Sequence, residues 1–195
     1  MEPLIRQFVW LDFRLATLFA VLIPLLLLAW SLRAKAEPLK RSLFIYWRVA
    51  SLFAIAIYLA IAALPLSFLA GFVARLLIPL SLWYWQDINE DIAMSRGILK
   101  TYFNVWRWAV SAYFVISAVF SAFYVPCAFS SLEQLSHTCK IWFEPPLAFR
   151  AVFHAGTPVE NLGFCGIVGL IVYGLYLASF LVFSLPKQGR IAFRN

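Results

Sequence analysis

The sequence predicts an all-α polytopic membrane protein, a transmembrane helical bundle of about five spans. Of its 195 residues, 64% are hydrophobic and only 13% are charged, whereas a soluble domain carries roughly 25% charged residues. Apolar runs of about 18 residues or more recur, and each is long enough to cross the ~30 Å hydrocarbon core of a bilayer as a helix. Little of the chain lies between these runs. We therefore expect residues 1–195 to form a single integral membrane domain.

The first predicted span covers about residues 15–32. A cleaved secretory signal is the competing interpretation, because Ala34, Lys35 and Ala36 resemble a signal-peptidase site. The charges before the run are balanced, however, and its apolar core is too long for a signal peptide. We interpret it as a span that is retained.

The next apolar region is too long for one span and about right for two. We place spans at about 43–63 and 67–85, with the turn at Leu64 to Ser67, where a proline interrupts the pattern. The alternative is one span followed by a re-entrant segment, which would leave four spans in total. The polar connection 86–100 carries Ile88, Ile92 and Leu99 at helical spacing, which predicts a short interfacial helix.

The fourth and fifth spans are predicted at about 105–125 and 164–185. Between them lies the longest stretch expected outside the bilayer, the outer loop 126–163. Small residues allow transmembrane helices to approach closely. The fifth span is rich in glycine, which predicts close packing against a neighbour through Gly163, Gly166, Gly169 and Gly174.

The positive charges predict the orientation. With five spans, most of the basic residues that lie outside the apolar runs fall on one side of the membrane, and the positive-inside rule makes that side cytoplasmic. The N-terminus is then outside and the C-terminus is cytoplasmic. Six of the eight tryptophans fall at the predicted cytoplasmic boundary, as an aromatic belt would: Trp30, Trp47, Trp83, Trp85, Trp106 and Trp108. The net charge of +7 is thus assigned to topology and anionic lipid, and no nucleic-acid partner is expected.

Two stretches of the chain resemble each other. Leu22 to Leu25 with Trp30 matches Leu77 to Leu80 with Trp85, and each copy leads to a Trp-Arg-x-Ala motif, at Trp47 and at Trp106. Two hairpins in the same orientation would form a parallel repeat about an axis normal to the membrane. Leucine-rich spans that end on Trp-Arg also match by chance, so both interpretations stay open.

Arg75 is the residue with the highest expected free-energy cost of insertion into the membrane. It lies about ten residues before Trp85, hence ~15 Å from that boundary, and an arginine near the bilayer centre costs about 2.5 to 3.5 kcal/mol on insertion scales. Asp12, in the outer half of the bundle, is the carboxylate placed to meet it. Asp12 and Arg75 form the candidate intramembrane polar site, as a contact for a substrate or proton or as a structural ion pair. The remaining alternative is that Arg75 snorkels outward to the membrane surface.

A second group of charges is predicted at the cytoplasmic rim. Basic and acidic side chains at the same depth could form a network that clamps the second and fourth spans to the end of the third; its members are Arg48, Asp87, Glu90, Asp91 and Arg107. The three carboxylates could instead bind Mg²⁺ or Ca²⁺. No acidic loop motif supports that alternative, so we predict no metal site there.

Cys127 and Cys139 both lie in the outer loop and could form a disulfide if that side of the membrane is oxidising. Cys165 is expected within the fifth span. His137 and His154 are candidate ligands by residue type only, because no haem-attachment or histidine-pair motif accompanies them. We therefore predict no metal, no cofactor and no catalytic residue.

Several aromatic motifs resemble an uncharacterised family of small polytopic membrane proteins of cyanobacteria. They are Trp10-Leu11-Asp12, Tyr46-Trp47-Arg48, Pro79 to Trp83 followed by Asp87, Asn89 and Glu90, and Trp106-Arg107-Trp108. The resemblance covers nearly the whole chain and carries no known activity. It implies a photosynthetic cell and a thylakoid or plasma membrane.

These patterns favour a non-enzymatic accessory or assembly factor for a membrane protein complex, acting through other membrane proteins or as a homo-oligomer. The chain is small, little of it lies outside the lipid bilayer, and its aromatic, charged rim suits docking. The alternative function is a small transporter or channel-like protein with Arg75 and Asp12 in the polar path. A membrane enzyme acting on lipid or quinone is a third interpretation, without a nucleophile motif to support it.

Overall fold

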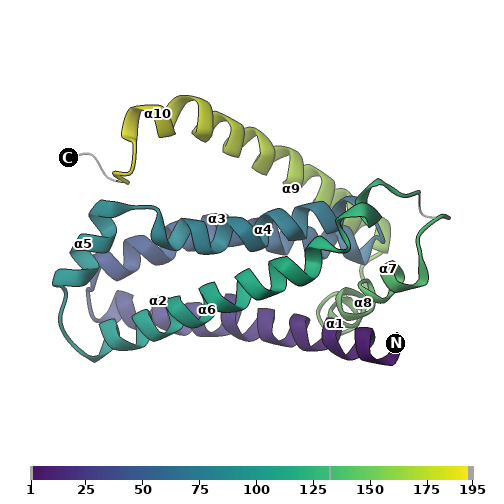
Figure 1. Ribbon diagram of the computed structural model, residues 1–195, viewed down its shortest axis with the longest axis horizontal. Coiled ribbons are helices and arrows are strands. Elements are labelled where there is room, and N and C mark those ends of the chain that lie inside the picture. Colours follow the sequence, from purple (N-terminus) through teal and green to yellow (C-terminus); the bar gives the residue numbers. More distant parts are fainter. Residues whose placement is uncertain (1, 132, 193–195) are drawn as a thin grey trace.

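The computed structural model describes residues 2–131 and 133–192, which form helices and contain no β-strand (Figure 1). The elements are α1 (Glu2–Ala16), the π-helical η1 (Thr17–Leu22), α2 (Ile23–Arg33), α3 (Glu37–Ile61), α4 (Leu66–Trp83), α5 (Gln86–Met94), α6 (Ile98–Ala122), the 3₁₀ helix η2 (Val125–Phe129), α7 (His137–Ile141), α8 (Glu144–Phe153), α9 (Val159–Ser179), the π-helical η3 (Phe180–Ser184) and α10 (Leu185–Gln188).

Five helices in this part of the chain are long and apolar enough to cross a membrane, which confirms the predicted fold class. They are Glu2–Arg33, Glu37–Ile61, Leu66–Trp83, Ile98–Ala122 and Val159–Gln188. Prolines mark several of their starts: Pro38 lies in the first turn of α3, and Pro65 and Pro158 precede α4 and α9. Proline suits a helix start because the first helical N–H groups have no partner within the helix.

The first helix is longer than the span predicted from the sequence. It runs through α1, η1 and α2 for 32 residues, or ~48 Å at 1.5 Å per residue, and exceeds the ~30 Å of a hydrocarbon core. The added residues before 15 are helical because they have a packed face, with Val9, Asp12 and Ala16 buried at helical spacing. The fourth and fifth helices likewise begin earlier than predicted, at Ile98 and Val159.

The π-helical η1 lies where two side chains from other helices reach the backbone of the first helix. The Tyr46 hydroxyl donates to the carbonyl oxygen of Ala20 at 2.7 Å, and Trp106 Nε1 donates to that of Phe19 at 2.9 Å. Irregular turns in a spanning helix persist where neighbours satisfy the freed backbone groups. Tyr46 and Trp106 pack edge to face at 5.1 Å, so this contact joins the first helix to α3 and α6.

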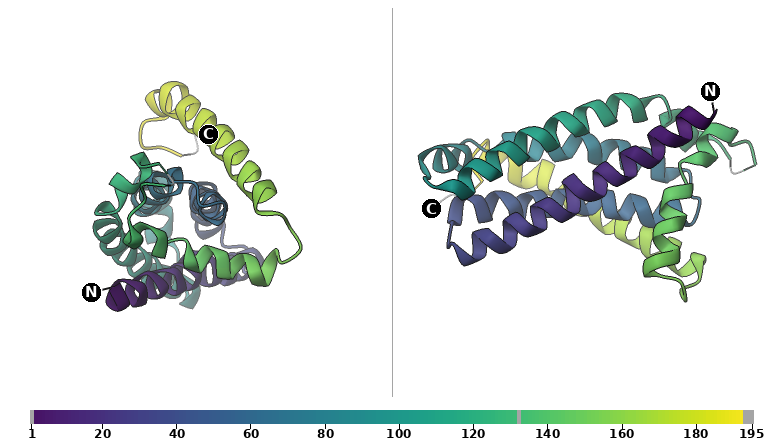
Figure 2. Two further views of the ribbon diagram at one scale, coloured as in Figure 1. Left: turned by 90° about the vertical axis from the view of Figure 1, so that its right-hand side faces the viewer. Right: turned by 90° about the horizontal axis from the view of Figure 1, so that it is seen from below.

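The outer loop is folded across one end of the bundle, which we call the α8 end. Figure 2 (left) shows α8 running across the direction of the long helices. The first helix is tied to it, since Arg6 Nε donates to both carboxylate oxygens of Glu144 at 3.1 and 3.2 Å and Trp10 Nε1 donates to one of them at 3.3 Å. The opposite end, the α5 end, carries α5, whose Ile88 and Ile92 are buried in the core.

The two resembling stretches occupy different environments. Trp30 is 42% exposed whereas Trp85 is 9% exposed. Pro24 directly follows the π-helical η1 within the first helix, whereas Pro79 lies inside the regular α-helix α4. The resemblance between the stretches therefore does not extend to equivalent packing in the described residues.

Helix α9 contacts α3 closely through three of its four glycines. A Cβ atom at Gly163 would lie 2.6 Å from Ala62 Cβ, one at Gly166 would lie 3.0 Å from the backbone nitrogen of Leu59, and one at Gly169 would lie 3.2 Å from Ile55. Gly174 has nothing within 4 Å. The contact is thus confined to the part of α9 near the α8 end, and Figure 1 shows the helix diverging from α3 beyond it.

We expect Gly166→Leu to lower the free energy of unfolding by about 1 to 3 kcal/mol, because the added side chain must displace the backbone of α3. Unfolding of the purified protein in mixed detergent–SDS micelles measures the change. Gly174→Leu is the matched control, with the same residue change on the same helix but open space around it, and should be neutral or slightly stabilising. Equal losses in both variants would contradict the proposed α3–α9 contact.

Candidate intramembrane polar site

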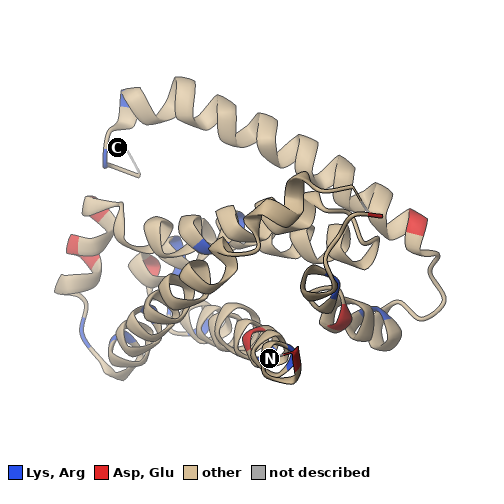
Figure 3. Ribbon diagram, turned by 45° about the vertical axis from the view of Figure 1, so that its right-hand side comes forward, with Lys and Arg blue, Asp and Glu red and all other residues tan. Residues whose placement is uncertain are grey.

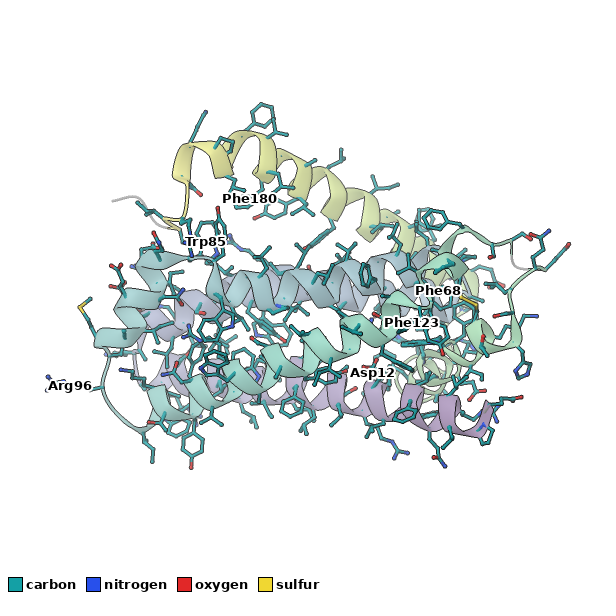
Figure 4. All side chains as sticks on the ribbon, in the orientation of Figure 1. Asp12, Phe68, Trp85, Arg96, Phe123 and Phe180 are labelled. Atoms are coloured by element: carbon teal, nitrogen blue, oxygen red, sulfur yellow. A yellow bond between two sulfur atoms is a disulfide. The ribbon has the colours of Figure 1, made fainter. Side chains whose placement is uncertain are left out.

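Asp12 and Arg75 meet inside the bundle. Arg75 Nη2 donates to Asp12 Oδ2 at 2.6 Å, and the two residues are only 6% and 9% exposed. Asp12 lies on the buried face of α1, and Arg75 lies on the face of α4 that also buries Gly71, Ala74 and Ile78. Figure 4 shows Asp12 on the first helix, away from either end of the bundle. The two most costly charges of the sequence are thus joined as one ion pair.

Helix α6 completes the hydrogen bonding of this pair. Ser117 Oγ accepts from Arg75 Nε at 2.7 Å and donates to Asp12 Oδ1 at 2.5 Å, and the Tyr113 hydroxyl donates to the same carboxylate oxygen at 2.8 Å. The remaining guanidinium nitrogen, Nη1, donates to the carbonyl oxygen of Gly71 at 3.0 Å. Each guanidinium nitrogen and each carboxylate oxygen therefore has a partner within the protein. We call Asp12, Gly71, Arg75, Tyr113 and Ser117 the polar cluster.

Aromatic rings enclose the guanidinium group. Its carbon lies 5.1 Å from the centroid of Phe53 and 5.6 Å from that of Trp142, distances at which a cation is attracted to a ring. Gly71 makes room for the group, because a Cβ at that position would lie 3.1 Å from Arg75 Nη1. The site is therefore shaped around the arginine by residues from α3, α4 and the segment that precedes α8.

A cavity of about 80 Å³ lies beside the polar cluster. Asp12 and Arg75 line it together with Ser121, and Trp142 and Phe143 line it from the α8 end. Sites for drug-sized ligands are ~300 to 1,000 Å³, so this space suits a few water molecules or a very small solute. Chemically, the arrangement can hold a charge in the membrane and present a cation and hydroxyl groups to such an occupant.

The spacing of the α6 residues is a signal that the sequence analysis missed. Tyr113, Ser117 and Ser121 recur every four residues, which places three hydroxyl groups on one face of a helix. All three contact Asp12 or line the cavity. Polar residues aligned in an apolar helix indicate an interhelical hydrogen-bonded face, and this stripe could have identified α6 as the third partner of Asp12 and Arg75.

The predicted rim residues are not joined into one network in the described part of the chain. Arg107 donates to the Asn89 side-chain oxygen at 2.7 Å and its guanidinium carbon lies 3.9 Å from the Trp83 ring centroid. Asn89, rather than an acidic neighbour, is the α5 residue that faces Arg107. Asp87 accepts from the backbone nitrogen of Ala192 at 3.0 Å, and Arg48 lies beside α9 and α10. Glu90 is exposed and Asp91 is half-buried.

The cysteines and histidines of the outer loop have structural partners. A disulfide joins Cys127 to Cys139, and so η2 to α7. His154 Nε2 lies 3.1 Å from the Tyr58 hydroxyl, and His137 Nδ1 lies 3.6 Å from a Glu2 carboxylate oxygen. Cys165 is an exposed free thiol on α9. Across the described residues, no three His, Cys, Asp or Glu side chains are grouped as a metal site would require.

The chain belongs to a family described as a protein of unknown function, DUF3177, whose model matches residues 6–193. No curated protein matches the chain, and no solved structure does. The family thus covers nearly the whole length of the sequence, including both residues of the intramembrane ion pair, and leaves the activity open.

Proposed function

We propose that this member of a family of unknown function is a non-enzymatic accessory or assembly factor for a membrane protein complex. The observation that carries the proposal is the closed polar cluster, in which Arg75 and Asp12 are hydrogen-bonded to each other and to α6. Polar groups in a membrane that are satisfied by other helices fix the arrangement of those helices. In this proposal the pair holds the first helix, α4 and α6 together, and the protein acts through its surfaces.

The surface best suited to a protein partner lies at the α5 end. Large apolar side chains are exposed there beside basic residues: Met94 is 72% exposed, and Ile98 and Trp108 are each 65% exposed. Arg96 lies between the first two in sequence, at the extremity of the bundle in Figure 4. Exposed apolar and aromatic groups flanked by charge are typical of interaction sites. We call Met94, Arg96, Ile98 and Trp108 the α5–α6 surface.

A mild-detergent pull-down of a C-terminally tagged copy tests this proposal, with the product resolved on a native gel and its absorption spectrum recorded. We expect the protein to co-migrate with a large complex, and Ile98→Glu to abolish that co-migration because it places a charge in the apolar part of the α5–α6 surface. Phe129→Glu is the control, at an apolar residue of the α8 end that is even more exposed than Ile98. A colourless species that runs alone, or as a small homo-oligomer, would refute the accessory role.

The alternative is a small transporter or channel-like protein, and the cavity beside the polar cluster favours it. That cavity is lined by both charged residues, as a polar path through the bundle would be. Replacement of Arg75 by leucine discriminates between the two functions. Loss of transport of a solute while the protein still accumulates would support the alternative, whereas unchanged growth of the cells would show that Arg75 is not a transport site.

We further propose that the N-terminus and the α8 end lie outside and that the C-terminus and the α5 end are cytoplasmic, in the plasma or thylakoid membrane of a cyanobacterium. The charge distribution supports this orientation. Figure 3 shows that the helix formed by α9, η3 and α10 carries no charged residue between Glu160 and Lys187, while most of the acidic residues lie near the bundle ends. More of the basic residues belong to the α5 end, which the positive-inside rule places in the cytoplasm.

Labelling with a membrane-impermeant maleimide checks this orientation. In a background that lacks Cys165, a cysteine introduced as Arg96→Cys should react only after the membrane is opened, and one introduced as Phe153→Cys should react in intact cells. Both positions are exposed, so accessibility within the protein does not differ between them. The reverse pattern would invert the proposed topology.

A further inference from the structure

A groove of about 360 Å³ lies between α9, η3 and α10 on one side and α3 and α4 on the other. It opens where α9 diverges from α3, beyond the glycine contacts described above (Figure 1). At the α5 end it is closed by Trp85 and Phe180, whose ring centroids are 6.1 Å apart and whose side chains face each other in Figure 4. The backbone of Gln86 also donates to that of Arg190 at 2.9 Å. The groove is thus open to the bilayer and bounded at one end.

The lining of the groove divides into an apolar wall and a few polar groups. Aliphatic and aromatic side chains from both sides form most of the wall, among them Val49, Leu77, Leu80, Leu177 and Leu181. The polar groups are Arg48, Ser81, Ser184 and Gln188. Two further basic residues lie nearby in sequence, Lys187 in α10 and Arg190 beyond it, where Arg190 donates to the carbonyl oxygen of Tyr84. An amphiphile with a negative head and an apolar chain matches this division.

Arg48 is the main reason to expect an anionic amphiphile in the groove. It lies eleven residues after the start of α3 at Glu37, ~16 Å along a spanning helix, and its side chain is exposed to the groove. Its guanidinium group makes no hydrogen bond or ion pair with any described residue. Arg75 and Arg107, by contrast, both have side-chain partners. An arginine at this depth requires an anion or a path to water.

We propose that the groove binds one anionic phospholipid, with the phosphate on Arg48 and an acyl chain along the apolar wall. Guanidinium–phosphate contacts are among the stronger charge-assisted hydrogen bonds, and basic pockets between spanning helices bind anionic head groups. A lone guanidinium group beside an apolar wall favours an anionic amphiphile over a partner helix as the occupant. The proposal holds for an accessory protein and for a transporter alike.

The test is lipid titration of the purified full-length protein by native mass spectrometry, with phosphatidylglycerol and phosphatidylcholine of identical acyl chains as probes. We expect phosphatidylglycerol to bind more tightly, and Arg48→Gln to weaken its binding by about tenfold or more, because one charge-assisted contact is lost. Arg96→Gln removes an equal charge outside the groove and should leave binding unchanged. Leu181→Trp fills the apolar wall and should weaken both lipids while Arg48 is retained.

Melting of each variant without added lipid shows whether it is folded. Only the wild type, Arg96→Gln and, to a lesser degree, Leu181→Trp should then gain thermal stability from phosphatidylglycerol. Equal affinities for the two lipids would overturn the proposal, as would an equal loss in Arg48→Gln and Arg96→Gln. Co-purification of a neutral prenylquinone in place of a phospholipid, or crosslinking of a partner helix to Leu181, would likewise overturn it.

Discussion

Replacing Arg75 with leucine should lower the free energy of unfolding by about 3 to 5 kcal/mol, the range measured when one partner of a buried ion pair is removed. The change leaves the Asp12 carboxylate buried without its cation, and it removes the donors to Ser117 and to the Gly71 carbonyl oxygen. Unfolding in mixed detergent–SDS micelles, followed by far-ultraviolet circular dichroism, measures the loss. We expect it to be the largest effect of any single substitution considered for this chain.

The double variant Asp12→Leu, Arg75→Leu distinguishes two effects on stability, the loss of the ion pair itself and the cost of leaving one buried charge unpaired. Both charges are then absent, and exchanging a buried pair for apolar residues is often neutral or even stabilising. We therefore expect the double variant to recover most of the stability that Arg75→Leu loses. A double variant as unstable as the single one would show that the cation is needed for its packing against Phe53 and Trp142, and not for its pairing with Asp12.

The class of fold and the pairing of Asp12 with Arg75 could be predicted from the sequence, because both follow from the free-energy cost of placing unpaired polar or charged groups in lipid. Long apolar runs have no other stable state than spanning helices. An arginine within such a run needs a partner at its own depth, and few carboxylates are near enough. The hydroxyl groups of Tyr113 and Ser117 carry no comparable penalty, and so their part in the site was not apparent.

The ends of the helices and the contacts at the rim could not be predicted from the sequence, because they depend on tertiary packing. The first helix continues through residues 2–14 because that segment docks on the outer loop through Arg6 and Glu144. Arg107 donates to the side-chain oxygen of Asn89, because the orientation of α5 directs Asn89 toward it. The charges of the three neighbouring carboxylates alone suggested ion pairs with the rim arginines. The orientation of the nine-residue helix α5, however, decides which of its side chains contacts Arg107.

Removal of the disulfide should lower the free energy of unfolding by about 3 kcal/mol, the chain-entropy estimate for a loop of this size. Cys127 and Cys139 are twelve residues apart in sequence and join η2 to α7. Both are buried in a cluster with Ala60, Leu135 and Phe143, and Phe143 also lines the cavity beside Arg75. Without the bond, the segment that covers the polar cluster gains conformational freedom in the unfolded state and loses its anchor in the folded one.

The measurement compares the stability of the double variant Cys127→Ser, Cys139→Ser with that of the single variant Cys165→Ser. The wild type is also measured with a reducing agent. Cys165 is exposed and free, so its replacement should change stability by no more than ~0.5 kcal/mol. The reduced wild type should unfold like the double serine variant, and the cavity should admit a thiol reagent at an introduced Ser121→Cys more rapidly in both. If the reductant leaves stability and labelling unchanged, Cys127 and Cys139 do not anchor the outer loop over the ion pair.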